Sequence, residues 1–190
     1  MAADSRKIII IAAPSGSGKT SITRFLLHKY PALCLSVSAA TRKPRGEEKD
    51  GVHYHFISED EFKHKIEENA FVEWEMVYEG SYYGTLKAEL ERIWSLGRTP
   101  ILDIDVKGAI HLQDQFPNRC LSIFIEPPSV EELEKRLRLR GTDKDQVIAE
   151  RVENAKRELA RKKDYDFLIM NDDVDDAYRS LKNAIERILK

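Results

Sequence analysis

Apolar runs alternate with helix-like patterns along most of this chain. Short, continuous apolar runs are typical of strands buried on both faces of a parallel sheet. They occupy residues 8–11, 33–38, 100–105, 121–125 and 167–170. Apolar positions at helical spacing, together with helix start and stop residues, predict helices. These helices cover residues 19–30, 58–68, 86–96, 129–140, 146–163 and 175–189. The alternation predicts an α/β fold, a mainly parallel sheet flanked by helices.

The segment from about residue 42 to residue 83 breaks this alternation. A polar loop with Pro and Gly covers residues 41–51, and alternating residues 52–57 predict a half-exposed strand. Ser58 and Glu61 form a capping box that opens a short helix, and residues 71–77 predict another strand before a turn at residues 79–81. We expect a small antiparallel insert above the carboxyl ends of the core strands, where ligands of such folds bind.

Composition sets limits on the class of protein. The 190 residues carry 31 Lys and Arg against 33 Asp and Glu, a net charge of −2. This balance argues against a nucleic-acid-coating protein, so any anion site must be local. The two cysteines have no metal-ligand or redox spacing, and no stretch has the length and apolarity of a membrane span or signal peptide. We therefore expect a cytoplasmic protein without nucleic-acid, membrane or obligatory protein partners.

Residues 12–21 carry the strongest chemical signal, a predicted phosphate-binding loop. They lie between an apolar strand and a helix, the context that the motif GxxxxGK[ST] requires. Gly16 and Gly18 allow a tight turn whose N–H groups point at one anion, Lys19 can reach the outer phosphates, and the Thr20 hydroxyl can hold Mg²⁺. Ala13 replaces the first glycine of the motif. The alternative is a Gly-Ser turn with a chance lysine, which the flanking strand and helix make the weaker interpretation.

Arg42 and Arg45 predict a site for the phosphate of an acceptor. They lie three residues apart in the polar loop, and the forked guanidinium donors suit a phosphate dianion. Tyr54 and Tyr83 could each donate a phenol to the same group. Taken alone, the two arginines are more simply solvated charges; the phosphate loop upstream favours the binding interpretation.

Asp103 and Asp105 end a buried strand on the same face, because side chains alternate along a strand. One acid at this position is suited to placing Mg²⁺ opposite Thr20. The alternative is a pair of solvated acids.

Arginines also flank a break at Gly141 between two charged helices. Arg136, Arg138, Arg140 and Arg151 lie in this segment. A helix–break–helix poor in apolar residues is suited to a mobile lid whose arginines stabilise transition-state charge. Many of its lysines and glutamates are simply solvated.

Several motifs in one order resemble the guanylate kinase family over nearly the whole chain. The motifs cover residues 13–19, 36–38, 41–45, 50–56, 71–74, 82–85, 101–105, 127–129, 140–142 and 171–173. The resemblance implies three parts. They are a core of residues 1–37, 86–126 and 164–190, a GMP-binding insert of residues 38–85, and a lid of residues 127–163. The family also accepts alanine at position 13.

The resemblance further implies a role for each matching residue. The catalytic residues would be Lys19, Arg42, Arg140 and Arg151. The ATP ligands would be Ala13, Pro14, Ser15, Gly16, Ser17, Gly18, Lys19, Thr20, Ser21, Arg136, Arg140 and Asn171. The GMP ligands would be Ser38, Arg42, Arg45, Tyr54, Glu73, Tyr83, Thr85, Asp105 and Arg151, with Thr20 and Asp103 for the metal. The chemistry agrees, because an ionised carboxylate only accepts hydrogen bonds and so matches the donors N1–H and N2 of guanine.

The implied activity is Mg²⁺-dependent phosphorylation of GMP by ATP in purine nucleotide metabolism, with dGMP as a further acceptor left open. One alternative is a non-catalytic guanylate kinase-like binding module; such modules typically lack an intact phosphate loop. Another is a kinase of similar fold that acts on a different phosphorylated metabolite, against which Glu73 and the loop at residues 38–45 argue.

Overall fold

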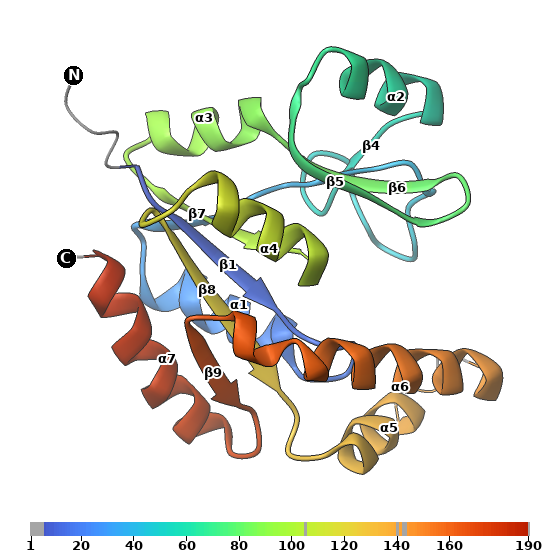
Figure 1. Ribbon diagram of the computed structural model, residues 1–190, viewed down its shortest axis with the longest axis vertical. Coiled ribbons are helices and arrows are strands. Elements are labelled where there is room, and N and C mark those ends of the chain that lie inside the picture. Colours follow the sequence, from blue (N-terminus) through green and yellow to red (C-terminus); the bar gives the residue numbers. More distant parts are fainter. Residues whose placement is uncertain (1–5, 105, 140, 142–143, 190) are drawn as a thin grey trace.

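A five-stranded sheet, here called the large sheet, forms the centre of the molecule (Figure 1). The computed structural model describes residues 6–104, 106–139, 141 and 144–189. The large sheet has the order β2-β7-β1-β8-β9, and every neighbouring pair in it is parallel. Its strands are β1 Ile8–Ala12, β2 Leu33–Leu35, β7 Thr99–Asp103, β8 Cys120–Glu126 and β9 Phe167–Met170. The predicted parallel sheet is confirmed.

Helices cover both faces of the large sheet. All five residues of β1 are therefore buried, and their side chains point alternately to one face and to the other. Ile9 and Ile11 pack into one apolar cluster, and Ile8 and Ile10 pack into another. The first cluster involves α1 Lys19–Lys29 and α7 Val174–Leu189, and the second involves α3 Lys87–Ser95 and α4 Val106–Gln115. Each face of the sheet thus has its own core.

The second sheet, here called the small sheet, has the order β4-β3-β6-β5. Its elements are β3 Ala39–Ala40, β4 His55–Phe56, α2 Glu59–Glu67, β5 Phe71–Tyr78 and β6 Ser81–Leu86. We call residues 39–86 the small-sheet unit; it projects to one side of the large sheet (Figure 1). The sheet is mixed, because β3 and β4 are parallel while β3–β6 and β5–β6 are antiparallel. The prediction of an antiparallel insert is therefore only partly right.

A helical hairpin, α5 Val130–Leu139 and α6 Asp145–Ala160, lies beside the loop after β1, and the 3-10 turn Lys162–Asp164 follows it. Leu133 and Leu137 of α5 pack against Ile148 and Ala155 of α6. Ser58 accepts a hydrogen bond from the Glu61 N–H, so the serine half of the predicted capping box is confirmed, and Ser129 accepts in the same way from the Glu132 N–H at the start of α5. Among the described residues, no helix combines the length and apolarity needed to cross a membrane.

Several element predictions differ from the structure. Helix α4 was not predicted, nor were strands β3 and β6. Strand β2 ends at Leu35 rather than residue 38. The strand expected over residues 52–57 is reduced to β4, because Gly51 has a φ of 70° and its N–H bonds the Tyr54 carbonyl in a turn.

Candidate active site

The loop between β1 and α1 has the shape of an anion cradle. Gly16 and Gly18 have φ values of 97° and 88°, and the Ser17 N–H donates to the Pro14 carbonyl at 3.1 Å. An added Cβ on Gly16 would meet Leu137 of α5 at 3.2 Å, so the loop also fits closely against the helical hairpin. Helix α1 begins at Lys19, where its free N–H groups and dipole favour an anion. Thus the predicted phosphate loop has the backbone geometry that the motif requires.

Side chains from other elements hold this loop. Asn171, just after β9, donates from Nδ2 to the Ser17 carbonyl at 2.6 Å. Arg136 of α5 donates to the Asn171 carbonyl at 3.1 Å, and Arg151 of α6 donates to the Ser15 Oγ at 2.7 Å. The structure therefore brings Asn171 and Arg151 into contact with the loop, and Arg136 into contact with Asn171.

Lys19 and Asp103 form an ion pair across the carboxyl edge of the large sheet. Lys19 starts α1 and Asp103 ends β7, the strand beside β1. Asp103 therefore lies next to the phosphate loop. Asp105 and Arg140 lie outside the described residues, so their predicted roles have no structural counterpart here.

A cavity of about 310 Å³ lies between the phosphate loop and the small sheet. The large-sheet side contributes Ala13, Ser15, Lys19, Asp103, Ile104 and Glu158. The small-sheet side contributes Ser38, Tyr54, Glu73, Glu75, Tyr83 and Gly84. The cavity thus joins the predicted donor residues to several predicted acceptor ligands, although these are far apart in the sequence.

The buried end of the small-sheet side is polar. Glu73 of β5 is 7% exposed, and its Oε1 accepts a 2.6 Å hydrogen bond from the hydroxyl of Thr85 on β6. Burying a carboxylate is unfavourable unless hydrogen-bond donors surround it. Thr85 is one such donor. Because a carboxylate only accepts hydrogen bonds, the pair is chemically suited to a ligand edge made of N–H donors.

Tyr54 and Tyr83 lie edge to face with ring centroids 6.0 Å apart, beside the cavity. Burial raises the pKa of Tyr54, and the Asp103 charge raises it further. Tyr54 therefore stays a neutral phenol, which can donate a hydrogen bond to an anion.

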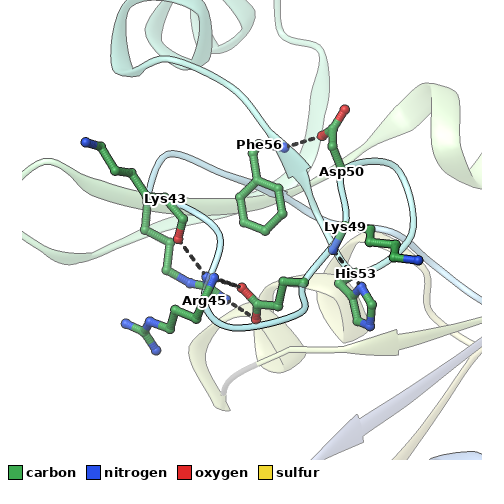
Figure 2. A network of polar contacts seen from close by, with 8 residues as sticks. Lys43, Arg45, Lys49, Asp50, His53 and Phe56 are labelled. Atoms are coloured by element: carbon green, nitrogen blue, oxygen red, sulfur yellow. Dashed lines mark hydrogen bonds and ion pairs between the residues drawn. The ribbon is translucent and has the colours of Figure 1, made fainter.

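Glu48 holds the predicted phosphate ligand Arg42. Its carboxylate accepts from both terminal nitrogens of Arg42, at 2.5 and 2.8 Å, and from the Arg45 N–H at 2.8 Å. The guanidinium of Arg42 also lies 4.9 Å from the Tyr54 ring centroid. Figure 2 shows this loop folded on itself, with further bonds from Phe56 N–H to Asp50 and from Lys49 N–H to His53.

The hydrogen bond from Arg42 is the main reason that the pKa of Glu48 is lowered to about 2, against an ordinary value of 4.5. Sequence reasoning missed Glu48, because a pair six residues apart in a loop has no periodic signal. It also missed Glu75 and Glu158, which line the cavity. The described residues contain no group of three or more His, Cys, Asp and Glu side chains that could hold a metal ion.

Comparison with known proteins identifies the family. The family model described as guanylate kinase matches residues 5–188. A guanylate kinase of Porphyromonas gingivalis is 45% identical over 96% of this chain and 98% of its own length. One of Idiomarina loihiensis is 45% identical over 94% of this chain and 85% of its own. A crystal structure of guanylate kinase from Anaplasma phagocytophilum superposes with a TM-score of 0.76 at 28% identity, covering 97% of this chain and 87% of its own. With this match of family model, sequence and fold, the chain belongs to the guanylate kinase family.

Proposed function

We propose that this protein transfers the γ-phosphoryl group of ATP directly to the phosphate of GMP. The observation that carries the proposal is the single cavity shared by Lys19 of the phosphate loop and Glu73, Tyr54 and Tyr83 of the small sheet. A phosphoryl transfer between two nucleotides needs a donor site and an acceptor site that face each other. The phosphate loop on one side of this cavity supports the assignment of the donor site, and the small sheet on the other side supports the assignment of the acceptor site.

The donor half is assigned to the phosphate loop. Residues 13–21 would hold the β- and γ-phosphates through their N–H groups, with Lys19 on the outer phosphates. Asn171 bonds this loop and Arg136 bonds Asn171, which supports their assignment to the ATP side. Arg151, assigned to catalysis and to the GMP side, donates to Ser15 of the same loop. Arg140 is assigned to the same charged hairpin from the sequence motif alone. We assign residues 127–163 as a lid and residues 38–85 as the GMP-binding insert.

The acceptor half is assigned to the small sheet. Arg42, Arg45, Tyr54 and Tyr83 would hold the GMP phosphate, since forked cations and phenols suit a dianion. Glu73, Thr85 and Ser38 would recognise the guanine edge, with Asp105 as a further acceptor for N2. Adenine reverses the donors and acceptors at this edge, so AMP would leave buried groups unpaired.

The donor atoms of Thr20 and Asp103 fit Mg²⁺, which prefers one or two protein oxygens and completes its shell with phosphates and water. When bound, the ion neutralises charge on the transferring phosphates. The protein groups do the rest: they orient the two nucleotides and stabilise the charge that moves between them. No general base is needed, because the attacking phosphate oxygen is already anionic. The cytoplasmic location stays a prediction from the sequence.

A coupled assay for ADP release tests the proposal. With ATP and Mg²⁺, GMP should support turnover, while AMP, sugar phosphates and the absence of an acceptor should give near-background rates. If another phosphorylated metabolite is the better acceptor, the assignment of guanine is wrong. GMP binding without turnover would indicate a binding module instead.

A further inference from the structure

Residues 36–38 carry the chain from the large sheet to the small sheet. Ser36 still donates its N–H to the Ile101 carbonyl of the large sheet, at 2.8 Å. Ser38 already accepts at its carbonyl from the His55 N–H of the small sheet, at 2.9 Å. Val37 is therefore the single residue between the last bond to one sheet and the first bond to the other. We call Val37 the pivot.

The return passage lies beside the pivot. Strand β6 ends at Leu86 and helix α3, which packs on the large sheet, begins at Lys87. Lys87 still holds the small-sheet unit, because its N–H donates to the Ala70 carbonyl and its Nζ donates to the Asn69 carbonyl. The first turn of α3 is thus the second connection of the unit.

Glu89 joins these two passages. It lies in the first turn of α3, is 5% exposed, and its Oε1 accepts the Val37 N–H at 2.9 Å. Arg92, one turn further on, donates to both oxygens of this carboxylate at 2.7 and 2.8 Å. A bidentate arginine holds a carboxylate in one orientation, so the acceptor offered to Val37 is fixed in place.

From this arrangement we infer that Glu89 is a positioning residue, which fixes the pivot and so sets how the small-sheet unit faces the phosphate loop. The inference rests on the proposed function, in which GMP binds to the unit and ATP binds to the large-sheet side. Glu89 is not among the residues that line the cavity, and it acts on neither substrate directly.

This placement predicts an unusual kinetic result. Most of the proposed GMP ligands lie within the small-sheet unit, and the proposed ATP ligands lie on elements of the large-sheet side. Loosening the pivot leaves the GMP ligands and the ATP ligands each in place relative to one another. It widens the range of distances between the γ-phosphate of ATP and the phosphate of GMP. Because a misplacement of about 1 Å can lower a rate by as much as 10²-fold, kcat should fall while binding is preserved.

The test compares Glu89→Ala with Glu91→Ala. Glu91 lies on the same helix but is exposed and pairs with Arg6 on the surface. For Glu89→Ala we expect kcat to fall about tenfold, with the Kd of GMP from calorimetry and the KM of ATP within about twofold of wild type. Hydrogen exchange at the Val37 amide should become at least about tenfold faster, because its acceptor is gone. Glu91→Ala should match wild type in all four measurements.

If the alanine variant does not fold, a second variant, Glu89→Gln, tests whether Glu89 fixes the position of Val37. This variant keeps an oxygen for Val37 but loses the paired charge, so a smaller fall in kcat and a smaller gain in exchange are expected. Unchanged kcat in an active background, unchanged exchange at Val37, or a rise in the Kd of GMP that matches the fall in kcat would overturn the inference. If wild type itself lacks GMP-dependent turnover, the proposed function fails, and the exchange measurement still decides whether Glu89 holds the pivot.

Discussion

Thr85 donates a 2.6 Å hydrogen bond to Glu73, and both side chains are buried beneath the small-sheet side of the cavity. The bond joins neighbouring strands, since β5 and β6 pair Glu73 with Thr85. This bond restrains the orientation of the Glu73 carboxylate. The carboxylate is an ordered acceptor, as a site that distinguishes guanine from adenine requires.

Glu73→Gln should therefore weaken the recognition of guanine. The amide places an NH₂ donor against guanine donors, so kcat/KM for GMP should fall by about 10²-fold or more. The discrimination between GMP and AMP should shrink by a similar factor. Glu67→Gln, on the exposed surface of α2, is the control for loss of an acid. Steady-state kinetics with both nucleotides provide the measurement, and an unaltered preference for GMP would contradict the assignment of Glu73.

Lys19→Met should abolish most turnover without preventing GMP binding. Removing one preorganised cation from a phosphoryl-transfer site lowers kcat by about 10²–10³-fold. Calorimetry should give a Kd of GMP close to that of wild type, because the proposed GMP ligands lie on other elements. Lys29→Met removes an exposed lysine at the other end of the same helix and should keep full activity. Normal kcat in Lys19→Met would refute the role given to this lysine.

Gly18→Ala should damage the phosphate loop more than its backbone strain alone explains. Gly18 and Gly46 both have positive φ, 88° and 54°, a conformation that disfavours a side chain by about 1–2 kcal/mol. Only at Gly18 would the new Cβ collide with a neighbour, the Nδ2 of Asn171. Gly46→Ala should lower Tm by about 2–8 °C, whereas Gly18→Ala should lower it further and raise the KM of ATP. Calorimetric melting and ATP kinetics of the two variants test this; equal effects would argue against the collision.

The ion pair of Glu48 with Arg42 predicts a pH effect on stability. The pKa of Glu48 in the folded protein is about 2, against an ordinary value of 4.5. Between these values the unfolded chain binds more protons, so the contribution of Glu48 is complete above about pH 4.5 and is lost as the pH falls towards 2.

From pH 5 to pH 3, wild type should therefore lose more stability than Glu48→Gln. We expect a difference of about 1 kcal/mol for a charged hydrogen bond that is partly exposed. Urea denaturation at the two pH values measures it. Glu47→Gln, an exposed neighbour, should follow wild type. A Glu48→Gln variant that loses as much stability as wild type would rule out this contribution.

The large sheet and most of the helices that cover it could be predicted from the sequence, because continuous apolar runs mark the strands and helical spacing of apolar residues marks the helices. Strand β1 is four isoleucines and an alanine, all fully buried, and the phosphate motif follows it directly. The small-sheet unit was harder, because β3 and β4 have two residues each and form only by pairing with distant partners. Helix α4 was missed, since it begins directly after residues 100–105, which the apolar run assigns to a strand, and its sequence contains Gly108, a weak helix former.

The same contrast applies to the site. Residues that carry recognisable chemistry, such as Lys19, could be found from motifs. Glu48 and Glu89 could not, because their importance depends on which backbone group or cation the fold brings against them. A glutamate in a loop or on a helix resembles any solvated charge until the partner is known.

The ion pair of Lys19 and Asp103 gives the phosphate loop an internal counter-ion. When ATP binds, Lys19 exchanges the Asp103 carboxylate for a phosphate of the nucleotide. Few salt ions from solution have to be released from the lysine in this exchange. Ionic strength acts mainly on charges that face bulk solvent. The affinity of this loop for its nucleotide should accordingly vary less with salt than the charge of the lysine alone suggests.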